Sequence, residues 1–129
     1  QGEEVMRVAD TSALYALFSE DDRFHERALK DVSAPEPIVV PSEILVETID
    51  LLAYRFGRSA GRKALDSLLQ LPHMRVAEKV ELSAVGEIYD KARGMSLADA
   101  FVVQTCVALG AEVLAYDRRI VAELRKRRP

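Results

Sequence analysis

Two aspartates stand directly after short apolar segments that we expect to be β-strands. Asp10 follows Val5–Ala9, and Asp117 follows Glu112–Tyr116. In a parallel α/β sheet, groups just beyond the carboxyl ends of the strands meet in one crevice. We therefore expect the two carboxylates to project to the same edge of the sheet. Each also has a structural explanation, because an aspartate at a helix start accepts hydrogen bonds from backbone N–H groups two or three residues on.

Asp99 lies in the first turn of a predicted helix, Ser96–Leu109, that has almost no polar side. The segment Ser96-Leu97-Ala98-Asp99 fits the S-x-x-D pattern of a capping box, which is its structural explanation. A helix that is apolar nearly all round is buried, so we expect Asp99 at the rim of the core. A buried carboxylate without a partner is costly. A metal ion, another cation or a hydrogen-bond network must compensate, which favours a functional role.

The predicted helix Glu43–Phe56 adds three further acids, Glu43, Glu47 and Asp50. Glu43 and Glu47 are four residues apart and share the side of the helix opposite its apolar face. A solvated helix surface explains both residues equally well. The periodicity alone does not choose Glu47 over Glu43.

Carboxylates that cluster without histidine or thiol partners favour a hard cation, which means Mg²⁺ or Mn²⁺ rather than Zn²⁺. Such a site activates water and neutralises charge on a phosphoryl oxygen, so phosphodiester hydrolysis is the natural reaction. His25 and His73 lie far apart in the sequence and have no ligand-like spacing. The sequence contains neither GxxxxGK[ST] nor GxGxxG, which argues against a nucleotide-binding phosphate loop.

The elements that must position these acids are marked out by proline, glycine and apolar runs. The predicted strands are Val5–Ala9, Ile38–Val40, Met74–Ala77 and Glu112–Tyr116. The predicted helices are Ala13–Phe18, Asp21–Val32, Glu43–Phe56, Ser59–Leu71, Glu81–Arg93, Ser96–Leu109 and Asp117–Arg128. Short apolar strands separated by helices imply a parallel sheet covered on both faces. We therefore predict an α/β fold with a single domain over residues 1–129.

Composition agrees with one soluble domain, because the chain has 129 residues of which 49% are hydrophobic and 30% charged. No apolar run is long enough for a membrane helix. The only cysteine is Cys106, which excludes an internal disulfide. Residues 1–4 lack the pattern of a secretion signal, and we interpret them as a disordered or tag-derived start. The predicted location is the cytoplasm.

Positive charge is concentrated at the end of the chain. Of the 18 basic residues, six lie in this last part: Arg118, Arg119, Arg125, Lys126, Arg127 and Arg128. The preceding part carries 12 basic and 20 acidic residues, whereas the whole chain has a net charge of −3. An acidic body with a basic end suits a protein that binds cations in one place and a polyanion in another. A solvated basic tail at 125–129 explains the pattern equally well.

Four segments, in this order and spacing, resemble the motifs of the PIN domain family across essentially the whole chain. They are DTSAL from Asp10, VPSEILVE ending at Glu47, SLADAF containing Asp99, and LAYD ending at Asp117. The resemblance implies a PIN-like parallel sheet with helices on both sides. It also implies that Asp10, Glu47, Asp99 and Asp117 surround one or two Mg²⁺ or Mn²⁺ ions, and thereby favours Glu47 over Glu43. Thr11 and Ser12 become supporting residues near the first aspartate.

Small single PIN domains of this kind are similar to VapC-type toxins of toxin–antitoxin pairs. The resemblance implies a homodimer that cleaves RNA to a 5′-phosphate and a 3′-hydroxyl and is silenced by an antitoxin protein. Basic residues are candidates for holding the RNA backbone, namely Arg55, Arg58, Arg62, Lys63, Arg118, Arg119 and the terminal cluster. A solvated helix–helix junction also explains the group from Arg55 to Lys63. Leu51, Leu52, Tyr54 and Phe56 suit a dimer or antitoxin contact, or core packing.

The chain departs from the family pattern in two places. Ala115 stands where many members carry a hydroxyl two residues before the last aspartate, and Met95 and Ser96 stand where some carry a further acid. Loss of a supporting hydroxyl weakens or reorients metal binding. All four principal acids are present, so the sequence does not indicate an inactive site.

Other functions remain open at this point. An RNA-processing nuclease without a toxic role has the same sequence features, and a non-catalytic RNA-binding module could keep the fold. The intact set of acids argues against the second. A receiver-type phospho-acceptor domain requires an acidic pair after its first strand and a lysine near its last. Here Ala9 precedes Asp10, and Arg118 follows the last strand.

Overall fold

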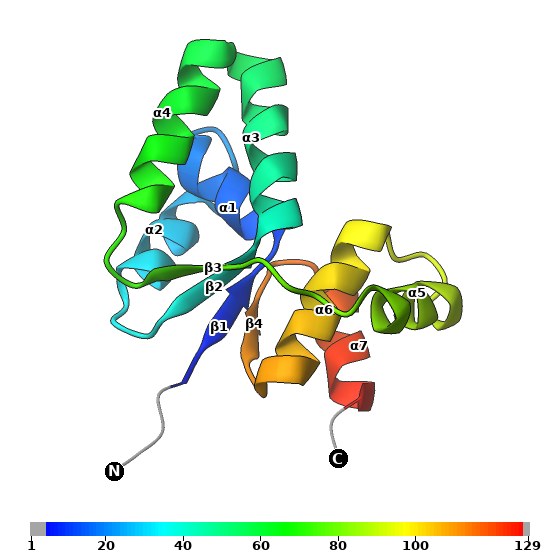
Figure 1. The fold of residues 1–129 in the computed structure, drawn as a ribbon. Helices are drawn as coiled ribbons and strands as arrows, with labels where there is room; N and C mark the ends of the chain where they lie inside the picture. Colours follow the sequence, from blue (N-terminus) through cyan, green and yellow to red (C-terminus); the bar gives the residue numbers. More distant parts are fainter. Residues whose placement is uncertain (1–4, 128–129) are drawn as a thin grey trace.

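The computed structural model describes residues 5–127, in which four parallel strands form a central sheet (Figure 1). The strands are β1 (Arg7–Ala9), β2 (Ile38–Pro41), β3 (Met74–Ala77) and β4 (Glu112–Leu114). Their order across the sheet is β3-β2-β1-β4, and all neighbouring pairs are parallel. Val8 pairs with Val39 on one side and Val113 on the other. The predicted start at 1–4 and the tail residues Arg128 and Pro129 lie outside the described residues.

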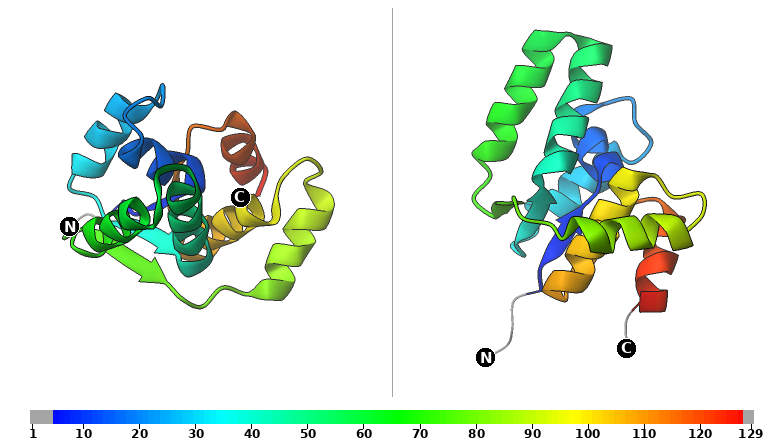
Figure 2. Two further views of the ribbon diagram at one scale, coloured as in Figure 1. Left: turned by 90° about the horizontal axis from the view of Figure 1, so that it is seen from above. Right: turned by 45° about the vertical axis from the view of Figure 1, so that its right-hand side comes forward.

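Helices cover both faces of this sheet, as predicted for an α/β fold. They are α1 (Thr11–Phe18), α2 (His25–Ser33), α3 (Ser42–Phe56), α4 (Arg58–Leu69), α5 (Leu82–Lys91), α6 (Leu97–Leu109) and α7 (Arg118–Arg127). Figure 2 shows α1 and α2 on one side of the sheet and α5 and α6 on the other. The apolar helix α6 contacts β1, β2 and β4, and Val102 and Val103 at its centre are fully buried. Within residues 5–127, no helix has both the length and the apolar character needed to cross a membrane.

Several predicted element boundaries are wrong by two residues or more, among them the following two. The helix expected from Asp21 begins only at His25, because Asp22 closes a turn in which its carboxylate accepts a hydrogen bond from the Phe24 N–H at 2.9 Å. Asx turns of this kind compete with helix formation. The last strand ends at Leu114, so Ala115 and Tyr116 belong to the loop that leads into α7.

Local rules explain how the chain brings the acids to one edge. Asp10 and Asp117 follow neighbouring strands, β1 and β4, and the N–H of Asp10 donates to the carbonyl of Leu114 at 3.1 Å. The helix α3 starts directly after β2, which ends at Pro41. Proline has no backbone N–H, so it cannot donate a hydrogen bond to a neighbouring strand. The pair α3 and α4 then rises side by side above this edge (Figure 1), joined at Gly57, whose φ of 100° favours glycine.

Candidate active site

A cavity of about 760 Å³ opens at the carboxyl edge of the sheet. All four predicted acids line it, together with the supporting residues Thr11 and Ser12. The complete lining consists of Asp10, Thr11, Ser12, Tyr15, Asp22, Arg23, Phe24, Glu47, Leu51, Tyr54, Arg55, Ser96, Asp99, Tyr116 and Asp117. The structure thus gathers acids from the starts of α1 and α6, from α3 and from the loop before α7 into one space.

Asp10 is the buried acid of this group, with 4% of its surface exposed. Its carboxylate caps α1 by accepting from the Ala13 N–H at 2.9 Å, and the Ser12 hydroxyl donates to both oxygens at 2.8 and 2.9 Å. The pKa of Asp10 is raised to about 6, because burial and the charges of Asp99 and Asp117 outweigh the two hydrogen bonds that lower it. Helix capping and a functional role are therefore compatible, because Asp10 caps α1 and also faces the other acids.

Asp99 lies at the rim of the core, where its apolar surroundings predicted it. It is half-buried, because the first turn of α6 reaches the mouth of the cavity while the buried part of the helix begins at Ala100. The expected capping box is present: the Asp99 N–H donates to Ser96 Oγ at 3.0 Å and the Ser96 N–H to Asp99 Oδ2 at 3.3 Å. The burial argument therefore applies to Asp10 rather than to Asp99.

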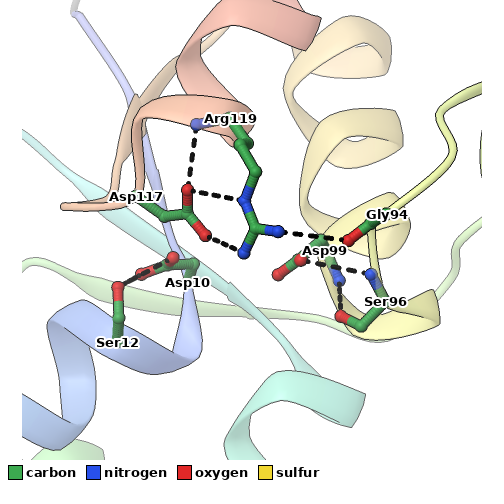
Figure 3. A network of polar contacts seen from close by, with 7 residues as sticks. All are labelled: Asp10, Ser12, Gly94, Ser96, Asp99, Asp117 and Arg119. Carbon is green, nitrogen blue, oxygen red and sulfur yellow. Dashed lines mark hydrogen bonds and ion pairs between the residues drawn. The ribbon is translucent and has the colours of Figure 1, made fainter.

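Asp117 is held by Arg119, as Figure 3 shows. The Asp117 carboxylate accepts from Arg119 Nη2 at 3.0 Å, from Nε at 3.3 Å and from the backbone N–H at 2.9 Å. The remaining nitrogen Nη1 donates to the carbonyl of Gly94 at 3.3 Å. The hydrogen bonds between the two side chains lower the pKa of Asp117 and raise the pKa of Arg119, which the negative charges of Asp117 and Asp99 also raise. Arg119 thus supplies a positive charge at the acidic end of the cavity.

Glu47 and Glu43 have different surroundings, although they share one side of α3. Glu47 lines the cavity and accepts a hydrogen bond from the Thr11 hydroxyl, which connects α3 to the start of α1. Glu43 lies outside the cavity and pairs with Ser42 at 3.2 Å. The geometry therefore favours Glu47 as the acid of this helix.

The chemistry of the donor set fits a hard divalent cation. The four acids offer only oxygen ligands. Burial and, to a smaller extent, the charges of Asp99 and Asp117 raise the pKa of Asp10, and a bound cation offsets both effects. As the side chains stand in residues 5–127, no group of three or more His, Cys, Asp or Glu is close enough together to hold an ion. Both oxygens of Asp117 accept hydrogen bonds from Arg119 instead.

The predicted RNA-binding residues divide into two groups. Arg55 lines the cavity. Arg58, Arg62 and Lys63 belong to α4 and do not line it, and Arg62 pairs with Asp66 at 3.1 Å along the same helix. Arg118 is exposed outside the cavity, and Arg119 is also exposed but binds Asp117.

The aromatic wall of the cavity was not predicted. It contains Phe24 and Tyr116, whose rings stack with centroids 4.8 Å apart, together with Tyr15 and Arg23. Tyr116 could have been noticed because it precedes Asp117, and Tyr15 because it lies one turn after Thr11 in the same helix. The turn that carries Arg23 and Phe24 has no such signal in the sequence.

The match to known families agrees with this geometry, since residues 7–126 match the PIN domain. The chain belongs to the PIN domain family. This PIN domain is similar in structure to VapC20 of Mycobacterium tuberculosis, a toxin that cleaves the sarcin–ricin loop. The TM-score is 0.75, with 26% identity over 91% of this chain and 93% of that chain.

A second similar structure is VapBC2 from Rickettsia felis, bound to a DNA fragment from its promoter. The TM-score is 0.69, with 12% identity over 92% of each chain, which supports the fold alone. Among curated proteins, none matches the chain. Together with the parallel sheet, these likenesses confirm the predicted PIN fold.

Proposed function

We propose that this PIN domain is a Mg²⁺- or Mn²⁺-dependent endoribonuclease and the toxin of a toxin–antitoxin pair. One observation carries the nuclease proposal: Asp10, Glu47, Asp99 and Asp117 come from four separate segments and face one cavity. Helix capping explains Asp10 and Asp99 individually. It does not explain why two further acids, one of them on the middle of α3, share the same space.

The four acids are proposed to hold the metal, and their neighbours fix where each carboxylate points. Ser12 and the Ala13 N–H orient Asp10, and Thr11 orients Glu47. When bound, the divalent ion supplies an activated water and neutralises charge on the phosphate oxygens. Glu47 is exposed at the mouth, where it can complete the ligand set or position the attacking water. We expect products with a 5′-phosphate and a 3′-hydroxyl.

The biological part of the proposal is supported by similarity. VapC20 is described as a toxin that cleaves an RNA loop, and it matches this chain over nearly its whole length. We therefore propose RNA as the substrate, an antitoxin protein as a partner and a homodimer as the assembly. A nuclease of RNA processing would use the same acids, so the cavity does not distinguish it from a toxin.

The test is cleavage of a mixed structured RNA by metal-stripped protein, with and without millimolar Mg²⁺ or Mn²⁺. We expect cleavage only with metal, and a loss of at least about 100-fold in Asp99→Asn, which removes a proposed ligand. Glu43→Gln is the matched control, because it removes an acid from α3 outside the cavity. It should cleave like the wild type, whereas Glu47→Gln should be impaired.

Two outcomes would contradict the proposal. Cleavage that persists in Asp99→Asn would show that the acids are assigned wrongly. A folded wild-type protein that binds RNA but cleaves none with either metal would instead be an RNA-binding module. Co-expression with a neighbouring small antitoxin gene tests the toxin role separately, because only a toxin is expected to arrest growth and to be relieved by that partner.

A further inference from the structure

We propose that Tyr116 is a positioning residue of the metal site, because its hydrogen bond to Asp31 on α2 holds the adjacent Asp117 where a divalent cation requires it. This inference rests on the proposed role of Asp117 as a metal ligand. Three observations carry it. The segment around Asp117 has few other contacts, Tyr116 is bound closely to α2, and the same residue of α2 is bound to the sheet.

Asp117 lies where β4 passes into α7, between the buried side chains of Leu114 and Ile120. Among residues 5–127, its carboxylate accepts hydrogen bonds from Arg119 alone, which belongs to the same short segment. The side chain of Arg119 is exposed and reaches another part of the chain through one hydrogen bond of 3.3 Å to the Gly94 carbonyl. A contact of an exposed charged side chain contributes little. The position of Asp117 therefore needs a firmer anchor from a neighbouring residue.

Tyr116 directly precedes Asp117 and binds this segment to α2 and to the turn before it. Its hydroxyl donates to Asp31 Oδ2 at 2.8 Å. Its ring stacks on Phe24 with 4.8 Å between the centroids and 25° between the planes, and the guanidinium of Arg27 lies 4.9 Å from its centre. The ring and the hydroxyl of this half-buried side chain are thus both in contact, so few orientations of Tyr116 satisfy all three partners.

The partner of Tyr116 on α2 is itself bound to the central sheet. Arg7 on β1 is half-buried, and its guanidinium donates to the backbone carbonyl of Asp31 and, at 2.8 Å, to that of Glu36. Carbonyls at the end of a helix have no partner within the helix, so an arginine there stabilises that end. Because β1 leads directly into Asp10, the contacts through Asp31 fix the loop of Tyr116 relative to the strand that carries another of the acids.

The consequence for metal binding follows from populations. Without the hydrogen bond to Asp31, the segment has more arrangements available, and Asp117 faces the other acids in only a fraction of them. An ion has to select that fraction, so the apparent affinity falls by the same factor. The net contribution of one hydrogen bond corresponds to a factor of about 2 to 12, which limits the effect.

The test measures Mn²⁺ binding to metal-stripped protein, without RNA, by electron paramagnetic resonance of the free ion. Tyr116→Phe keeps the ring and removes the hydroxyl, and it should weaken binding about two- to tenfold. Asp31→Ala removes the acceptor and should have the same effect. The double variant should bind no more weakly than either single variant, because both substitutions remove one and the same bond.

Two controls separate the hydrogen bond from other effects. Asp31→Asn removes the negative charge but keeps an oxygen that accepts from Tyr116, so its affinity should lie within about twofold of the wild type. Ser33→Ala removes a hydroxyl from the same helix, where it donates to the Leu29 carbonyl at 2.7 Å, and should change nothing. Hydrogen exchange of the amides at 115–119 in EDTA should be faster in Tyr116→Phe and unchanged in Ser33→Ala.

The inference is overturned if Tyr116→Phe binds Mn²⁺ as tightly as the wild type, because the bond to Asp31 then only stabilises the fold. It is also overturned if Asp31→Asn binds as weakly as Asp31→Ala, because the charge would then be responsible. Asp117→Asn distinguishes these failures from failure of the metal site. Weaker binding in that variant, with no effect of Tyr116→Phe, rejects the positioning role alone. Unchanged binding in Asp117→Asn rejects Asp117 as a metal ligand, and the positioning role with it.

Discussion

Asp10 meets two opposing demands at the scale of the single residue. As the cap of α1 it must accept hydrogen bonds, which favour the ionised carboxylate, and the Ala13 N–H and Ser12 hydroxyl supply them. As a nearly buried acid facing Asp99 and Asp117, it is favoured in its neutral form. The effects of burial and repulsion on the pKa are larger than those of the hydrogen bonds. Without a metal, ionisation of Asp10 at neutral pH therefore lowers the stability of the fold.

The first prediction is a dependence of metal-free stability on pH. The pKa of Asp10 is about 6 in the folded protein against an ordinary value of 3.8, so the folded state binds the proton more tightly. Its contribution to stability is present below about pH 4 and is lost as the pH rises through about 6. In Asp10→Asn, which keeps the cap but cannot ionise, this loss is absent.

Urea unfolding in EDTA at a series of pH values measures the effect. Relative to Asp10→Asn, the free energy of unfolding of the wild type should fall by about 2–3 kcal/mol between about pH 4 and pH 7. Parallel pH profiles for the two proteins would contradict the raised pKa. Adding Mg²⁺ at neutral pH should stabilise the wild type more than the variant, since a ligand stabilises the state that binds it.

Arg119 gives a second prediction at the residue scale. It donates to both oxygens of Asp117 and is itself exposed, so an ion at Asp117 competes with an ion pair that is weak in water. We expect Arg119→Ala to bind Mn²⁺ roughly five- to tenfold more tightly, because a competitor and a nearby positive charge are both removed. Electron paramagnetic resonance of free Mn²⁺ measures this without RNA or turnover.

The control is Arg118→Ala, which deletes the same charge from the adjacent residue of α7. Arg118 is exposed, and its side chain forms no ion pair or hydrogen bond with the four acids among the described residues. Its removal should change Mn²⁺ affinity less than twofold, as expected for a surface charge screened by salt. Weaker Mn²⁺ binding by Arg119→Ala would mean that Arg119 orients Asp117 for the ion rather than competing with it.

At the scale of elements, the pair α3 and α4 determines where Tyr54 and Glu47 stand, and Gly61 sets how closely the two helices pack. A Cβ at Gly61 would lie 2.9 Å from Ala53 Cβ and 3.3 Å from the carbonyl oxygen of Ile49. No side chain fits this approach unless the helices separate. The contact therefore requires glycine although α4 would otherwise favour alanine.

Opposite effects of one substitution at two helical glycines form the third prediction. Gly61→Ala should destabilise the protein by about 1–2 kcal/mol, because overpacking outweighs the gain in helix propensity. Gly86→Ala, in α5, meets nothing within 4 Å and should stabilise it by about 0.5–1 kcal/mol. Urea unfolding of both variants tests this. If both stabilise the protein equally, the close approach of α3 and α4 is not a constraint.

How far the elements could be predicted depends on whether their signals are local. Gly57 and Gly110 ended helices α3 and α6 as predicted, because a positive φ at glycine is a property of the residue itself. Asp22 misled the prediction, because the same residue type serves helix starts and turns. Strand β4 was predicted too long because nothing in Ala115-Tyr116 shows that Tyr116 stacks on Phe24.

At the scale of the whole molecule, convergence of the acids was predictable and their detailed partners were not. Asp10 and Asp117 meet because they follow neighbouring parallel strands, a rule that the order of elements already implies. The hydrogen bonds of Arg119 to Asp117 and Gly94, and the stacking of Phe24 on Tyr116, depend on how side chains pack in the folded structure. Sequence periodicity contains no information on such contacts, so Arg119 was interpreted only as a residue for RNA.

The distribution of charge over the molecule also differs from what the sequence suggested. The basic end was a candidate for holding RNA, but α7 runs away from the carboxyl edge of the sheet (Figure 1). At about 1.5 Å per residue, Lys126 lies roughly 12 Å along the helix from Arg118. Glu123 also pairs with Lys126 at 3.9 Å and with Arg127 at 2.8 Å. The positive charges that line the cavity are instead Arg23 and Arg55.

The fourth prediction compares these two groups of charges through the salt dependence of RNA binding. Each phosphate contact to a single strand contributes about 0.7 to the slope of log K against log salt concentration. In the Asp99→Asn background, Arg23→Ala with Arg55→Ala should therefore reduce this slope by roughly 1.4. Arg125→Ala with Lys126→Ala removes the same net charge and should leave the slope nearly unchanged, because those residues lie at the far end of α7.

Anisotropy titrations of a single-stranded RNA at several salt concentrations measure the slope for each pair of substitutions. A larger loss of slope in the second pair would place the RNA along α7 and away from the aromatic wall, since counterion release reports which cations lie against the phosphates.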